Sequence, residues 1–303
     1  MTTFWNQRTA SFVLSATLLL PVLSGCGGGP AATPEATVGP IVSAPLESPD
    51  RENVSPSPAP LLLPRATGER VEENKKAAVD CSHPEEGYIM ARRGNTERKL
   101  KLRITKETEY IYDLTEEDWT AFPLSEGDGK YTVAVFEQVE DTTYLSVFAF
   151  TFEVELEPFA PFLRPNQQVD YANSPLTLAK AEELTAEADG QKEEIEKIYS
   201  FVSSALNYDD QWAKTVQSGY IPVLDQVLRK EGGICLDFAA LMTAMVRSRA
   251  IPCRLVVGDA GSAYHAWVEV WEEDRSEWTR YDPTFTASGK DVSGVEYTPK
   301  FYY

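Results

Sequence analysis

The sequence predicts an α+β protein, in which a β-rich region precedes a region that mixes helices and strands. Over residues 99–150, apolar and polar residues alternate repeatedly, which is typical of strands with one exposed face. At residue 235 a helix begins that is apolar on nearly every side, so we expect it to lie in the centre of a core.

Composition limits the class of protein. The 303 residues are enough for two domains with their own cores, and the formal net charge is −19. A chain this acidic lacks the electrostatic footprint of a nucleic-acid binder, and an anionic lipid surface would repel it. We therefore expect no nucleic-acid partner. With two histidines and four cysteines, zinc fingers and multi-disulfide scaffolds are also excluded.

Residues 1–25 are predicted to be a signal peptide. A single basic residue, Arg8, precedes an apolar stretch that is shorter than the roughly 18–20 residues needed to span a bilayer. The stretch ends in Leu23-Ser24-Gly25-Cys26, which looks like a bacterial lipobox; an ordinary secretory signal is the alternative. We expect lipid on Cys26 to hold the protein at the extracytoplasmic face of the bacterial cell membrane.

Residues 26–76 are predicted to be a disordered tether. Three consecutive glycines and nine of the 20 prolines fall within residues 27–64, so no helical or strand period survives there. We expect this segment to hold the folded part of the chain away from the membrane.

Residues 77–165 are predicted to form a small antiparallel β sandwich that serves as a spacer or a substrate-presenting wall. No catalytic motif occurs in it. Cys81-Ser82-His83 could supply half a metal site, but no partner ligands lie nearby, so we expect a coincidental surface pair. The predicted strands cover residues 99–104, 109–112, 130–136 and 143–150.

Residues 166–303 are predicted to form the catalytic domain. Helical periods cover residues 176–188, 192–206 and 223–228, and the apolar helix follows two glycines and begins at Cys235. At this position the unpaired N–H groups and the helix dipole favour a thiolate and can receive an oxyanion. The alternative is a small buried cysteine with no chemical role.

A histidine and an aspartate follow on adjacent strands. The strands are predicted over residues 253–257, 264–271 and 278–282, so the sheet can hold His265 beside Asp282. That is the base-and-orienter arrangement that a thiol nucleophile needs. Alternatively, His265 is a satisfied core histidine and Asp282 only begins the turn at Pro283.

Three separated blocks resemble the transglutaminase-like superfamily over residues 170–290. In order, they are the glycines with Cys235 and Asp237-Phe238-Ala239, then His265-Ala266-Trp267-Val268-Glu269-Val270, then Asp282-Pro283-Thr284. The resemblance implies a papain-like core, in which the cysteine-bearing helix packs on an antiparallel sheet. It also implies that Cys235 is the nucleophile, His265 the general base and acid, and Asp282 the orienter. The preceding β domain resembles that of some bacterial lipoproteins in the family.

The resemblance does not fix the oxyanion donor or the state of the other cysteines. In animal transglutaminases an upstream tryptophan donates to the oxyanion, and Trp212 or Tyr220 could do so here. The calcium sites of those enzymes have no recognisable counterpart, so we expect no metal and no other cofactor. Cys81 and Cys253 could form a disulfide or could both stay reduced.

The predicted reaction is acyl transfer at an amide through an acyl-thioester. We expect a cysteine peptidase or amidase that acts on a protein or peptide substrate at the cell envelope. One alternative is a transglutaminase that crosslinks proteins, and another is a non-catalytic binding or scaffold protein of the envelope.

Overall fold

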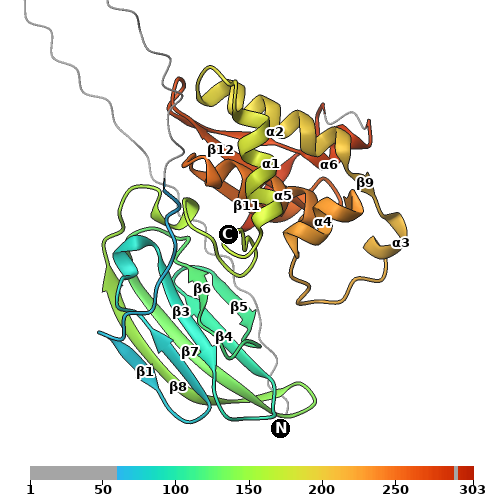
Figure 1. Cartoon of the computed structure of the whole chain (residues 1–303). Coiled ribbons are helices and arrows are strands. Elements are labelled where there is room, and N and C mark those ends of the chain that lie inside the picture. Colours follow the sequence, from blue (N-terminus) through green and yellow to red (C-terminus); the bar gives the residue numbers. More distant parts are fainter. Residues whose placement is uncertain (1–59, 290–292) are drawn as a thin grey trace, which may run out of the picture. The chain divides into compact units, whose positions relative to one another are not determined.

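The computed structural model describes residues 60–289 and 293–303 (Figure 1). The predicted signal peptide, Cys26 and most of the predicted tether therefore lie outside the described residues. Strands dominate up to about residue 155, and helices and strands mix from residue 175 onward, so the α+β class is confirmed. In the part of the chain that the structure describes, no helix is both long and apolar enough to cross a bilayer.

The first half of the described chain is a β sandwich, as predicted. Its core contains side chains from two four-stranded antiparallel sheets, with the strand orders β1-β2-β3-β6 and β5-β4-β7-β8. The strands are β1 (Val71–Glu73), β2 (Ala77–Asp80), β3 (Tyr88–Arg93), β4 (Leu100–Thr105), β5 (Glu109–Asp113), β6 (Thr120–Pro123), β7 (Gly129–Glu140) and β8 (Thr143–Val154).

The sandwich differs from the prediction in where it begins and in two strands that were not predicted. The first strand begins at Val71, inside the segment predicted to be a tether, because it pairs with β2. Strand β2 is buried at all four positions and β3 at its first four, so neither shows the alternation from which a half-exposed strand can be recognised.

The second half of the described chain places helices around a four-stranded antiparallel sheet with the order β13-β12-β11-β14 (Figure 1). The strands are β11 (Cys253–Ala260), β12 (Ala263–Glu272), β13 (Glu277–Tyr281) and β14 (Tyr297–Tyr302). The helices are α1 (Pro175–Thr185), α2 (Gln191–Ala205), α3 (Asp210–Ala213), α4 (Leu224–Lys230), α5 (Cys235–Ser248) and α6 (Pro283–Ala287). Short 3-10 turns cover Pro84–Glu86 and Ala160–Phe162.

Helix α5 is the centre of this second core, as its sequence predicts. Every residue from Asp237 to Ser248 is buried, and the helix contacts α1, α2, β11 and β12. Ala266, Val268 and Val270, which the alternation in β12 places on one face, all belong to the same core as α5. The predicted helix packed on an antiparallel sheet is therefore confirmed.

A buried arginine near the end of α5 links three segments. The guanidinium of Arg247 donates from Nε to the carbonyl of Cys253 and from one terminal nitrogen to the carbonyl of Arg164, both at 2.8 Å, and from the other to the carbonyl of Tyr303. Burial lowers the pKa of Arg247. Three carbonyl acceptors compensate for the desolvation of the charge and fix the end of α5 to its neighbours.

The two cores each hold one buried cysteine. Cys81 belongs to the core of the sandwich and Cys253 to the core around α5. Both thiols are free, so the disulfide that the sequence left open is not formed.

Candidate active site

Cys235 is the first residue of α5, as predicted, and its side chain is half-buried. Positions 232 and 233, just before this helix start, have no room for a side chain and therefore require glycine. A Cβ at Gly232 would lie 2.9 Å from the carbonyl oxygen of Asn207, and one at Gly233 would lie 2.6 Å from the carboxylate of Asp237. These two glycines form a short strand, β10 (Gly232–Gly233), which pairs with β9 (Asn207–Tyr208) and carries the chain into the helix.

The start of α5 is held by the carboxylate of Asp237. One oxygen accepts the backbone N–H of Ile234 at 2.8 Å, and the other accepts the hydroxyl of Tyr220 at 2.7 Å. Burial raises the pKa of Asp237, and the two hydrogen bonds act in the opposite direction. The residue thereby fixes the backbone on both sides of Cys235.

His265, on β12, lies between Cys235 and Asp282. Its Nε2 is 2.8 Å from Oδ2 of Asp282, and the thiol of Cys235 is close enough to the ring to raise its pKa. The exposed fractions of His265 and Asp282 are 5% and 7%, so the pair is almost completely removed from water.

The surroundings of His265 favour its charged form. Burial lowers the pKa of His265, but the hydrogen bonds and negative charges of Asp282 and Cys235 outweigh it and raise the pKa to about 9. The ring is also stacked on that of Phe285, with the centroids 4.4 Å apart and the planes 10° from parallel. The imidazole is therefore fixed in orientation, and its neighbours favour the protonated form.

Asp282 has two structural tasks. It is the N-cap of α6, where its Oδ1 accepts the backbone N–H of Phe285 at 3.0 Å. Its Oδ2 accepts from His265 and from the hydroxyl of Tyr297, the latter at 2.9 Å. Asp282 therefore both caps α6 and hydrogen-bonds His265, while its predicted role as the orienter of a catalytic histidine stays a prediction.

Trp212 and Tyr220, which the sequence offered as oxyanion donors, contact each other edge to face at a centroid distance of 4.7 Å. The hydroxyl of Tyr220 donates to Asp237 rather than remaining available for a substrate. Trp212 lines an open hollow of about 680 Å³ that extends to Gly233, two residues before Cys235. The hollow is formed by residues 207–212 and 230–233.

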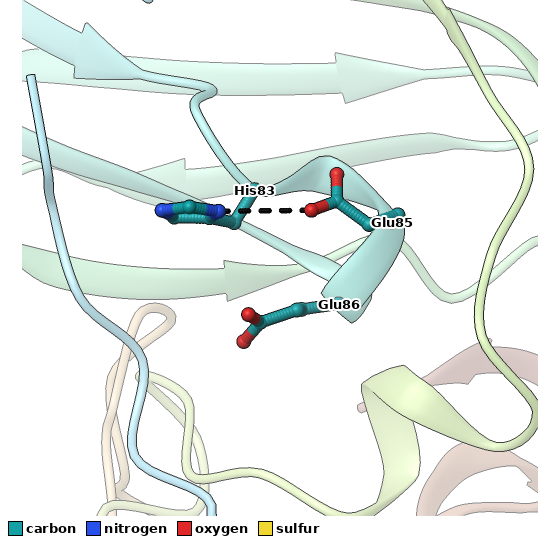
Figure 2. Close-up of side chains that lie close together, drawn as sticks. All are labelled: His83, Glu85 and Glu86. Atoms are coloured by element: carbon teal, nitrogen blue, oxygen red, sulfur yellow. Dashed lines mark ion pairs between the residues drawn. The ribbon is translucent and has the colours of Figure 1, made fainter. Parts of the chain in front are cut away.

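His83, the second histidine of the chain, belongs to the sandwich. Figure 2 shows it with Glu85 and Glu86; the potential ligand atoms of the three lie within 4.8 Å of one another. However, Glu86 is paired with the guanidinium groups of Arg65 and Arg164 at 3.3 and 3.2 Å. These two positive charges neutralise Glu86 and disfavour a cation there, so we assign no metal site. Cys81 is not part of the cluster; its thiol lies 3.6 Å from the carbonyl oxygen of Arg70.

Some residues of the site were not predicted from the sequence. The acidic residue two positions after Cys235 was a detectable signal for Asp237, since an acid in the first turn stabilises a helix start. Phe285 follows the predicted turn at Pro283 and was not singled out. Tyr297 comes from β14, a strand for which no period was recognised, and we find no signal in the sequence that points to it.

Comparison with known proteins supports the family that the sequence resembles. Residues 178–283 match the model of the transglutaminase-like superfamily. No curated protein matches the chain.

Solved structures give weaker similarities. A structure from Cytophaga hutchinsonii, described as a candidate cysteine protease, is 16% identical, with a TM-score of 0.39 over 67% of this chain and 71% of that one. The periplasmic domain of TgpA from Pseudomonas aeruginosa is 14% identical, with a TM-score of 0.37 over 74% of this chain and 98% of that one. Red sea bream transglutaminase is 16% identical, with a TM-score of 0.24 over 65% and 47%.

Proposed function

We propose that Cys235, His265 and Asp282 are the catalytic triad of a cysteine-dependent acyl-transfer enzyme, and the match of residues 178–283 to the transglutaminase-like superfamily supports this. The observation that carries the proposal is the position of His265, which is hydrogen-bonded to the carboxylate of Asp282 in a buried setting and is close enough to the thiol of Cys235 for that thiol to raise its pKa. A purely structural histidine has no need of a half-buried thiol on one side and a buried carboxylate on the other.

The geometry supports the following first half-reaction. The sulfur of Cys235 attacks the carbonyl carbon of an amide, and the carbonyl oxygen becomes an oxyanion near the first turn of α5, where backbone N–H groups favour negative charge. The imidazolium of His265 then gives its proton to the leaving amine, the C–N bond breaks, and an acyl-thioester remains on Cys235.

In the second half-reaction, the now neutral His265 takes a proton from water. The resulting hydroxide equivalent attacks the thioester, the C–S bond breaks, and the carboxylic acid product leaves Cys235 as a thiolate beside imidazolium. Asp282 stabilises the imidazolium and keeps the ring in the orientation that both steps need. The hollow beside Gly233 offers space for the acyl side of a peptide.

We propose hydrolysis as the completing step, so that the protein is a peptidase or amidase with a protein or peptide substrate. Water needs no second binding site, whereas crosslinking needs a groove for an amine. The full-length protein is incubated with a peptide amide in H₂¹⁸O, with and without a primary amine, and products are identified by mass spectrometry. ¹⁸O-labelled acid supports hydrolysis. A new amide in preference to acid supports the crosslinking alternative, and no covalent adduct on Cys235 supports a binding or scaffold protein.

The reactivity of the thiols provides a second test. Iodoacetamide at neutral pH should label Cys235 much faster than Cys253 or Cys81, because the latter two are completely buried. Burial also raises the pKa of Cys81, and that of Cys253 to about 12, so their thiolates are scarce at neutral pH. Peptide mapping after a short exposure measures the rates. Equal labelling of the three in the folded protein would contradict the assignment of the nucleophile.

We further propose that the enzyme is a lipoprotein, held by Cys26 at the extracytoplasmic face of the bacterial cell membrane. The lipobox-like sequence Leu23-Ser24-Gly25-Cys26 supports this location. Cys26→Ser should move the protein from the membrane fraction to the soluble fraction and leave its turnover unchanged. A variant that stays in the membrane fraction would contradict lipid attachment at Cys26.

A further inference from the structure

Asp282 receives a hydrogen bond that the proposed triad does not require. Its Oδ2 accepts from Nε2 of His265 at 2.8 Å and also from the hydroxyl of Tyr297 at 2.9 Å. A carboxylate oxygen has two lone pairs, so both donors can be served at once. The tyrosine therefore shares the oxygen that pairs with the imidazolium.

The ring of Tyr297 is fixed from two sides. It meets Trp267 edge to face, with the centroids 5.0 Å apart, and the guanidinium of Arg280 lies over its face, 3.8 Å from the centroid. Burial raises the pKa of Tyr297, and so do the charge and hydrogen bond of Asp282. The hydroxyl thus stays protonated and directed at Asp282 over the pH range in which the enzyme would work.

A second donor on the same oxygen changes what Asp282 can do for His265. A hydrogen bond to a buried carboxylate stabilises its negative charge and makes that oxygen a weaker acceptor for any other donor. We propose that Tyr297 is a positioning residue that holds Asp282 in place and limits its pull on the His265 imidazolium. This inference rests on the proposed function, because it assumes that His265 and Asp282 work as a pair.

The consequence concerns the proton that His265 must release. In the proposed reaction His265 donates a proton to the leaving amine and later accepts one from water, so an imidazolium held too tightly would slow proton donation. By donating a hydrogen bond to Asp282, Tyr297 weakens the attraction between Asp282 and the imidazolium. The pKa of His265 is thereby brought closer to the pH at which the enzyme would work.

Other titratable or charged groups lie around this cluster, and all of them remain when the hydroxyl of Tyr297 is removed. Tyr199 hydrogen-bonds the backbone carbonyl of Asp282 at 3.4 Å, and Tyr208 and Tyr264 are close enough to Cys235 to sense its charge. The remaining groups are Cys235 and Asp237 of α5 and Arg280 of β13. The comparison with a Tyr297→Phe variant therefore isolates one hydrogen bond.

The experiment is an NMR titration of His265 in the full-length protein. The chain has two histidines, so a His83→Gln background leaves His265 as the single imidazole signal. In this background, Tyr297→Phe removes the hydroxyl and keeps the aromatic ring. The midpoint of the His265 titration should then rise by at least about half a pH unit. Tyr302→Phe, the same change on the same strand, is the matched control and should leave the midpoint unchanged.

A second measurement covers the reacting thiol. Iodoacetate is an anion, so a positively charged His265 attracts it and speeds the alkylation of Cys235. The rate of alkylation by iodoacetate should therefore fall as the pH rises and the imidazolium loses its proton. In the Tyr297→Phe variant, the alkylation rate with iodoacetate should fall at a higher pH than in wild type. The pH dependence of alkylation by neutral iodoacetamide should not move in the same way.

The outcomes separate this inference from the proposed function. An unmoved His265 midpoint in a folded Tyr297→Phe variant overturns the role of Tyr297, even if the enzyme hydrolyses amides. A raised midpoint supports that role even if no hydrolysis is found, in which case the proposed reaction fails alone. A midpoint that moves equally in Tyr302→Phe shows a general effect of the strand and also overturns the role.

Discussion

The two histidines of this chain both lie beside carboxylates, but in opposite environments. His265 is 2.8 Å from Asp282, and both side chains are buried, whereas Nδ1 of His83 lies 3.6 Å from Glu85, whose side chain is 48% exposed. His265 is also stacked on Phe285, while Nε2 of His83 is hydrogen-bonded to the hydroxyl of Thr67. A histidine and a carboxylate thus form a close pair where both are buried and a looser pair where the carboxylate is exposed to water.

The comparison teaches that proximity alone does not identify a catalytic histidine. The cluster at His83 brings together three potential ligands, but arginines already neutralise one of them. At His265 the imidazole is hydrogen-bonded to a carboxylate and is close enough to a thiol for that thiol to raise its pKa, and the carboxylate is itself held by two further donors.

The largest difference should appear when each histidine is removed. His265→Ala should lower kcat/KM by at least about 10⁴-fold, because no other base can take the place of the imidazole. His83→Ala should leave turnover unchanged. Both are measured on the peptide amide, with circular dichroism as the test of folding. Similar losses in the two variants would break the distinction between the sites.

A somewhat smaller loss should follow Asp282→Asn. The amide removes the charge that stabilises the imidazolium, and it can place a donor against Nε2, which favours the wrong tautomer. We expect a loss below that of His265→Ala and no more than about 10⁴-fold, as in serine triads. Glu85→Gln is the matched change at the exposed pair and should not affect turnover. A triad role for Asp282 would be excluded by wild-type kcat/KM in the Asn variant.

The buried pair should also make stability depend on pH. The folded-state pKa of His265 is about 9, above its unfolded value near 6.5, so its contribution is fully present below about pH 6.5 and is lost as pH rises through 9. The unfolding free energy of wild type relative to His265→Gln should therefore fall between pH 6.5 and 9.5, by up to about 3 kcal/mol. Urea titrations across this range measure it. In an Asp282→Asn background the fall should be smaller; a difference that does not vary with pH would contradict the strong pairing.

The smallest effect should come from the exposed pair. Glu85→Gln removes one partner of an ion pair that water screens, so the unfolding free energy should fall by less than about 1 kcal/mol and the effect should shrink in high salt. Urea titration at low and high salt is the measurement. A loss of several kcal/mol would mean that His83 and Glu85 form a stronger structural pair than their exposure indicates.

Periodicity and motif spacing identified most of the catalytic half of the chain. The start of α5 at Cys235 and the burial of one face of β12 follow directly from local patterns of apolar residues. Strands β2 and β3 were missed because they are buried on both faces in these stretches, and a continuous apolar run carries no period of two.

By itself, the sequence determined which elements present Cys235, His265 and Asp282, because a helix start and a strand alternation are local properties. Only the tertiary structure decided that Asp282 both caps α6 and holds His265, and that Tyr297 and Asp237 support the site. These contacts join segments whose meeting depends on how the sheet and helices pack. Tyr297 reaches Asp282 because β14 pairs with β11. No local pattern in the sequence of either strand predicts that pairing.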